Sequence, residues 1–308
     1  MNAHLLRTLV AIAAIAAAAP FAHAGRSCEQ RPPSAAAVSQ AMQLAERTAA
    51  RLTQSGASVV VLARAGQNLS EYGLRYSHLG FAYREGEGSA TVWRVVHKLN
   101  QCGSARASIY RQGLGEFFLD DLWQYEAAVV VLAPQAQAHL RPLLVDNVAV
   151  ARLDTPAYSM VAYPWSSRYQ QSNQWALETL ALAEEPQAAT RERAQAWLRL
   201  HGYEPTTLHL SAFKRLGARL TRANIAFDDH PYEKRFGDRI ETLCAGWGAL
   251  ANLRDFYNGC PSLAQFGVRP LPDPALTPYA NALAFYETSV SGGNLYWKIL
   301  GDAPNRRF

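Results

Sequence analysis

The chain has 308 residues, of which 49% are hydrophobic and 18% charged, and its formal net charge is +5 at pH 7. This apolar content is typical of a globular protein and excludes intrinsic disorder and low-complexity filaments. The excess of Lys and Arg is small and spread along the sequence, which argues against a nucleic-acid partner.

The first 24 residues have the pattern of a secretory signal peptide. Arg7 precedes an apolar run over residues 9–19, and Ala22-His23-Ala24 supplies a small-x-small cleavage motif. The run is shorter than the roughly 20 apolar residues of a transmembrane helix, and charged or polar residues interrupt every later candidate. We therefore expect a periplasmic protein, exported by a cleavable signal peptide, whose mature chain starts near Gly25 and has no membrane span.

Export affects the expected oxidation state of the four cysteines, because thiols outside the cytosol tend to be oxidised. Cys28, Cys102, Cys244 and Cys260 are expected to form two disulfides out of three possible connectivities. Cys244 and Cys260 are close in sequence, and their pairing would leave Cys28 to tie the mature N-terminus to Cys102. The connectivity stays open at this stage.

Hydrophobic periodicity predicts one helix, then strands, then mostly helices. In the first half, a helix is expected at 34–55 and another at 135–144, with strands at 57–64, 77–84, 91–99, 107–111 and 127–132. In the second half, a strand is expected at 158–163, with helices at 172–185, 190–201, 211–216, 239–252 and 279–286. This order predicts an α+β fold with an antiparallel sheet and packed helices. We expect a signal peptide at 1–24, one domain at 25–260 and a proline-rich C-terminal extension at 261–308.

The first candidate site lies on two neighbouring strands that carry His78 and His97. Residues 85–90 between them read as a hairpin turn. If Glu87 and Gly88 form a two-residue turn, His78 lies opposite His97 on the same face, about 5 Å away. Two facing imidazoles could supply a general base and its orienting partner. A half-exposed strand histidine without a catalytic role is the alternative.

The second candidate is Ser172, where a loop leads into a helix. A nucleophile at a helix N-terminus gains from the helix dipole and from free backbone N–H groups that can stabilise an oxyanion. A serine in this position is also a common helix cap, and the sequence alone favours that interpretation.

These segments resemble two families. A Ser-His-x-Gly strand, further strands and a nucleophile that opens a helix are similar to the circularly permuted papain-like group, which includes NlpC-like peptidases. More narrowly, residues 76–84, 93–100, 169–178 and 223–231 resemble an uncharacterised exported bacterial family, domain of unknown function 2145.

The papain-like resemblance implies roles for three residues. His78 would be the general base, His97 its orienting residue, and Ser172 the nucleophile at the position where the group has a cysteine. A hydroxyl is a weaker nucleophile than a thiolate at neutral pH. Ser172 is therefore either a working serine nucleophile or a sign that the site has lost its chemistry and kept a binding groove.

The third candidate is the run Asp228-Asp229-His230-Pro231. Adjacent residues in a tight turn seldom converge on one ion, so we expect a polar turn that anchors its loop or faces the groove, and no metal. Asp228, Asp229 and His230 are expected binding residues, together with Asn173 beside Ser172.

The resulting hypothesis is a hydrolase or acyltransferase of papain-like fold that acts on amide or ester bonds and needs no cofactor. The alternative is a non-catalytic periplasmic binding or envelope-assembly protein that uses the same groove. Cell-wall peptides or another envelope component are the expected partners, by analogy with the group. A Ser172 Oγ within roughly 4 Å of a His78 ring nitrogen would favour the enzyme.

Overall fold

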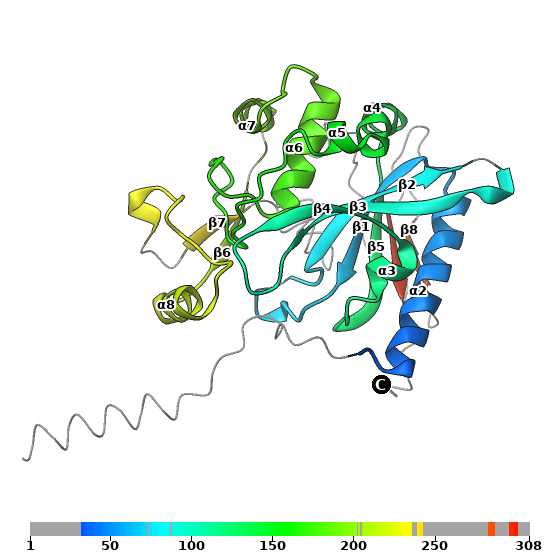
Figure 1. Cartoon of the computed structure of the whole chain (residues 1–308), viewed down its shortest axis with the longest axis horizontal. Helices are drawn as coiled ribbons and strands as arrows, with labels where there is room; N and C mark the ends of the chain where they lie inside the picture. Colours follow the sequence, from blue (N-terminus) through cyan, green and yellow to red (C-terminus); the bar gives the residue numbers. More distant parts are fainter. Residues whose placement is uncertain are drawn as a thin grey trace, which may run out of the picture.

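The centre of the molecule is a seven-stranded antiparallel sheet with the strand order β4-β3-β2-β1-β5-β9-β8. It is seen in a computed structural model that describes residues 32–72, 74–86, 88–201, 203, 205–235, 239–242, 283–286 and 296–300. Helices pack on both faces of the sheet (Figure 1), and the predicted α+β fold with an antiparallel sheet is confirmed.

The strands of this sheet are β1 (Val59–Ala65), β2 (His78–Glu85), β3 (Val92–Asn100), β4 (Ala107–Gly113), β5 (Gln124–Val131), β8 (Leu283–Tyr286) and β9 (Tyr296–Leu300). A second, two-stranded sheet consists of β6 (Thr206–His209) and β7 (Arg239–Thr242). The described helices are α2 (Ala35–Gln54), α3 (Leu114–Phe118), α4 (Pro134–Val145), α5 (Asn147–Val150), α6 (Ser172–Glu184), α7 (Arg191–Leu200) and α8 (Ala212–Thr221). β8 and β9 both come from the expected C-terminal extension.

Two helical layers cover the two faces of the sheet (Figure 1). Val60 and Leu62 of β1 pack with α2 and α3 on one face, and Val59 and Val61 pack with α4, α6 and α7 on the other. β1 is buried along its whole length and is apolar at every position except Arg64, as expected of a strand that is covered on both sides. We call these surfaces the α3 face and the α6 face.

The β2–β3 register differs from the prediction. Phe81 pairs with Val96 and Glu85 with Val92, so the connection is a six-residue loop with a 3₁₀ turn at Gly88–Ala90. The predicted two-residue turn at Glu87 and Gly88 is wrong. The register is displaced by two residues, and since side chains alternate with a period of two, every side chain keeps its predicted face.

Three predicted elements are also wrong. Residues 158–163 form turns instead of a strand, because Met160 bonds the Asn224 carbonyl and the Ser159 hydroxyl bonds the Ala226 carbonyl. Arg239–Thr242 and Leu283–Tyr286 are strands instead of parts of helices, since each pairs with another strand. The remainder of the predicted 239–252 and 279–286 helices lies outside the described residues, as does the expected signal peptide.

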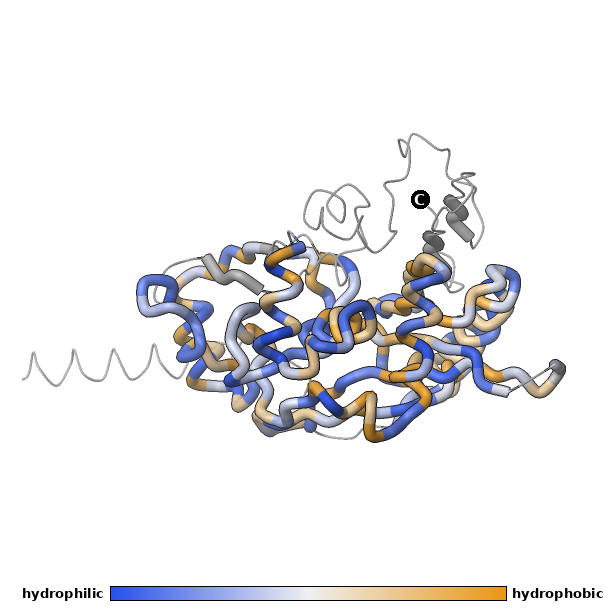
Figure 2. Tube along the Cα trace, turned by 90° about the horizontal axis from the view of Figure 1, so that it is seen from above, coloured by the Kyte–Doolittle hydropathy of each residue, from blue (hydrophilic) through white to orange (hydrophobic). Residues whose placement is uncertain are grey.

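Hydrophobic and hydrophilic residues are interspersed along the described trace (Figure 2). In the part of the chain that the structure describes, no helix combines the length and the apolar character required to cross a bilayer.

Candidate functional site

His78 and His97 meet on the α3 face of the sheet. Their Nε2 and Nδ1 atoms are 2.7 Å apart, and their ring centroids are 5.0 Å apart. The register places Gly80 opposite His97, where a Cβ on Gly80 would lie 2.7 Å from the His97 Cβ. The missing side chain at Gly80 thus leaves room for His97, which reaches diagonally to His78. Their predicted placement on one face is confirmed.

A chain of hydrogen bonds assigns the tautomers of both imidazoles. Gln112 donates its Nε2–H to Glu116 at 2.9 Å, so its Oε1 accepts from His97 Nε2 at 2.7 Å. If the ring is neutral, His97 Nδ1 is then an acceptor, and the His78 Nε2–H donates to it.

The surroundings keep both imidazoles neutral. Burial, followed by the positive charge of Arg64, lowers the pKa of His97 to about 3 and the pKa of His78 well below its usual value. Arg64 lies opposite His78 in the β1–β2 ladder, bonds the Phe117 carbonyl and Asp120, and lies 4.6 Å from the Phe117 ring centroid. A base whose pKa is lowered in this way accepts a proton less readily at neutral pH.

Ser172 lies at the start of α6, which covers the opposite face. Its hydroxyl donates to the Lys98 carbonyl at 2.8 Å, and its side chain also hydrogen-bonds Tyr158. His78 instead points to the α3 face, where it contacts His97 and Phe117. The structure brings the two histidines together and does not bring Ser172 to them. Ser172 is also not the cap residue, because Gln171 holds the N-cap position of α6, without a side-chain cap hydrogen bond.

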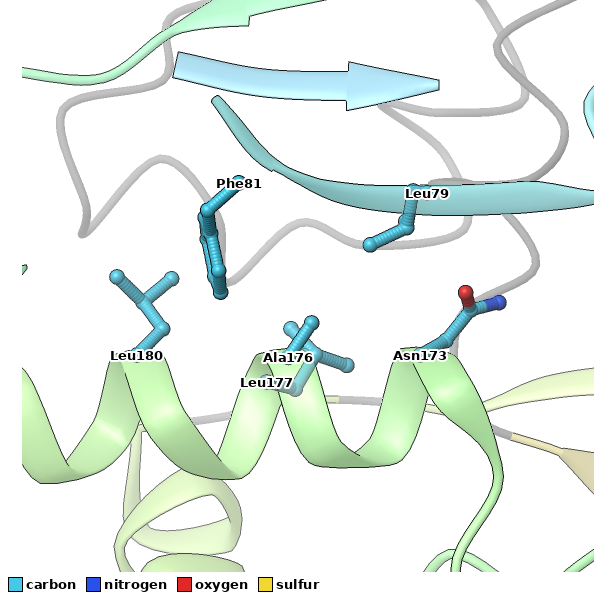
Figure 3. A pocket seen from close by; sticks show the side chains of 6 residues that line it. All are labelled: Leu79, Phe81, Asn173, Ala176, Leu177 and Leu180. Carbon is cyan, nitrogen blue, oxygen red and sulfur yellow. The ribbon is translucent and has the colours of Figure 1, made fainter. Parts of the chain in front are cut away.

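Asn173 lines a small cavity between β2 and α6 (Figure 3). Its other lining residues are all apolar: Leu79, Phe81, Ala176, Leu177 and Leu180. The space between these side chains has almost no room even for a water molecule, whereas typical small-molecule sites have volumes of roughly 300–1,000 Å³. The cavity offers Asn173 no further polar group with which to fix a substrate.

Asp229 and His230 form a buried pair that anchors the loop before α6. His230 Nδ1 lies 2.9 Å from one Asp229 oxygen, and the other oxygen accepts the Tyr163 backbone N–H at 2.8 Å. The neighbouring Asp228 is half-buried and pairs with Arg168 at 2.8 Å. These contacts agree with the polar-turn interpretation, and no group of three or more potential metal ligands occurs within the described ranges.

A charged network that was not predicted from the sequence is buried on the α6 face. Lys98 is fully buried and its Nζ donates to Asp154, to the Thr155 carbonyl at 2.8 Å and to Gln170 at 3.0 Å. Gln170 in turn donates to Glu178 at 2.6 Å. The network therefore connects β3, the loop before α6 and α6 itself.

Arg191 completes this network from α7. Its guanidinium pairs with Glu178 at 2.8 Å and donates to the Ser167 and Tyr169 carbonyls. Burial raises the pKa of Glu178, and the Arg191 charge opposes that rise; burial lowers the pKa of Lys98, and Asp154 opposes that. The sequence signal was a Glu and an Arg at positions of two helices that are otherwise mostly apolar where they are buried.

The predicted cysteine pairing stays a prediction. Cys102 lies in the turn after β3, and Cys28, Cys244 and Cys260 fall outside the described residues.

Fold and site together define an α+β protein whose antiparallel sheet carries a neutral histidine pair on one face and a charged network on the other. A family model of uncharacterised proteins conserved in bacteria, DUF2145, matches residues 51–246. The chain belongs to this family. No curated protein and no solved structure matches it.

Proposed function

We propose that this chain is an exported envelope protein that acts by binding a partner, without catalysis. One observation carries the proposal: the Ser172 hydroxyl is engaged by the Lys98 carbonyl on the α6 face, whereas the His78–His97 pair lies on the α3 face. A serine nucleophile that is activated by His78 needs that imidazole within hydrogen-bond reach of its hydroxyl.

Two further features support binding over catalysis. The His97 pKa of about 3 makes that imidazole a weak base. The cavity beside Asn173 is small and otherwise apolar, so it lacks the convergent polar groups of a substrate site. A surface contact with an envelope component therefore fits better than enclosure of a small substrate.

The N-terminal sequence is the basis for proposing export. Its charged start, apolar run and small-x-small motif are typical of cleavable signal peptides. Intact-mass measurement of the chain recovered from a periplasmic extract tests this, with a start at or near Gly25 expected. Recovery only from the cytoplasm with Met1 retained would overturn export.

The hydrolase or acyltransferase with Ser172 as nucleophile is the competing proposal, and one labelling experiment separates the two. A fluorophosphonate probe is applied to the wild type, Ser172→Ala, His78→Ala and Ser34→Ala. Ser34 is a matched control, because it caps the start of α2 by accepting the Ala37 N–H at 3.1 Å.

Binding without catalysis predicts equal background labelling of all four proteins. Labelling that is lost in Ser172→Ala and His78→Ala but kept in Ser34→Ala would overturn the proposal in favour of a serine hydrolase.

A further inference from the structure

Helix α8 carries an apolar stripe that faces solvent. Phe213 is 89% exposed, Leu216 58% and Leu220 76%. Their spacing of three and four residues puts them on one side of the helix. α8 lies at the edge of the molecule, away from the two helical layers on the main sheet (Figure 1).

The opposite side of α8 is attached to the body of the protein by a charged residue. Arg215 is 5% exposed, its guanidinium donates to the Lys234 and Arg235 carbonyls, and it lies 4.5 Å from the Phe227 ring centroid. Surface helices of globular proteins normally bury their apolar side. α8 has the reverse orientation, so its apolar stripe is available to a partner.

The charge around the stripe indicates what kind of partner fits. Residues 205–227 contain four basic residues, Lys214, Arg215, Arg219 and Arg222, and no Asp or Glu. Arg219 is exposed and lies one turn from Leu216. Lys214, also exposed, pairs with Glu71 from outside the segment. A helix with Phe and Leu on one side and basic residues beside them is typical of interfacial helices that bind anionic lipids.

We propose that α8 docks the protein on an anionic membrane surface, with the Phe213-Leu216-Leu220 stripe inserted at the level of the lipid headgroups. A ten-residue helix is about 15 Å long, too small to provide the roughly 800 Å² per partner of a stable protein interface by itself. A bilayer needs no such area, since apolar insertion and electrostatic attraction act together. This inference deepens the proposed binding function by naming its partner, and it rests on that function only in placing the protein near a membrane.

Vesicle flotation of the purified full chain tests the docking. Phosphatidylglycerol vesicles should carry the wild type at low salt, and phosphatidylcholine vesicles should carry it at least about tenfold less. Phe213→Ser/Leu216→Ser/Leu220→Ser should weaken binding to the anionic vesicles at least about tenfold. The control Val148→Ser/Leu200→Ser, which changes side chains 82% and 83% exposed on other helices, should bind like the wild type.

A second measurement tests whether α8 itself contacts the lipid, independently of any vesicle binding by the apolar run at residues 9–19. Trp fluorescence introduced by Phe213→Trp should be quenched by vesicles with brominated acyl chains, and that introduced by Leu200→Trp should not. Equal quenching of both, or equal flotation of the wild type and the triple variant, would overturn the proposal. Lipid-independent dimerisation that the triple variant abolishes would also overturn it, in favour of a second copy as the occupant.

The outcome of the vesicle experiments is independent of the fluorophosphonate labelling, because a serine hydrolase could equally bind membranes. Failure of vesicle binding with background labelling would remove the membrane partner and leave the non-catalytic proposal in place.

Discussion

Two consecutive residues of β3, His97 and Lys98, are both fully buried yet lie in opposite kinds of environment. His97 points to the α3 face and joins a chain of neutral hydrogen bonds through His78 and Gln112. Lys98 points to the α6 face and joins a charged network with Asp154 and Gln170.

The comparison shows two ways of burying a polar group in one sheet. On the α3 face, burial and the Arg64 charge lower the histidine pKa values, so the rings avoid carrying charge. On the α6 face, the two cations Lys98 and Arg191 face the two carboxylates Asp154 and Glu178, with hydrogen bonds to every one of them. On the α6 face, we expect the loss of a charge to lower the stability most. On the α3 face, we expect the stability to depend on packing and pH.

The largest effect is expected for Glu178→Ala. The substitution leaves Arg191 buried without its carboxylate, and breaking such a pair typically costs about 3–5 kcal/mol of stability. Urea unfolding at pH 7 measures the change. Glu184→Ala, on the same helix and paired with His139 near the surface, is the control and should cost less than about 1 kcal/mol. Similar losses in both variants would show that the network is not a special point of stability.

Packing on the α3 face is tested by Gly80→Ala. The new Cβ would lie 2.7 Å from both the His97 Cβ and the Val96 carbonyl oxygen, so β2 and β3 must move apart, at a cost of about 1–3 kcal/mol. Gly113→Ala is the control, because its Cβ would meet nothing within 4 Å and its φ of −75° suits alanine. Thermal or urea unfolding should separate the two variants. Equal stability would contradict the close approach of the strands.

The neutral state of His97 predicts a loss of stability in acid. Its pKa is about 3 in the folded chain and about 6.5 in the unfolded chain. The stability that the neutral ring contributes is therefore fully present above pH 6.5. Below that value the unfolded chain takes up a proton that the folded chain refuses, and about 1.4 kcal/mol is lost per pH unit until the folded pKa is reached. Urea unfolding at pH 5.5 and 4.5 should therefore give a flatter pH dependence for His97→Gln than for the wild type. Parallel slopes would contradict the lowered pKa.

Local pattern was enough to predict much of the fold. The helices predicted at 34–55 and 172–185 are observed at Ala35–Gln54 and Ser172–Glu184, since apolar spacing and capping are local signals. The shared face of His78 and His97 was predictable too, although the register was wrong, because an even shift preserves the face.

The sequence could not show which helices pack on which face of the sheet. Ser172 and His78 have the expected order along the chain, but α6 packs on the face away from the imidazoles. The Lys98 network escaped detection for the same reason: its charged members are spread over residues 98–191, and only tertiary packing brings them together. Arg239–Thr242 was mistaken for part of a helix because its strand partner, β6, is 30 or more residues away.

The smallest expected effect on stability concerns Ser172. This residue decides between the two proposed functions, because a serine hydrolase would need it on the same face as His78. Ser172→Ala removes the hydrogen bond to the Lys98 carbonyl and should cost about 1 kcal/mol in urea unfolding. Since His78 lies on the other face, Ser172→Ala and His78→Ala should act additively within about 0.5 kcal/mol in a double-mutant cycle. A coupling energy above about 1 kcal/mol would mean that the two side chains meet in solution, and it would restore the arrangement that a serine nucleophile requires. Additivity would leave each residue a structural part of its own face.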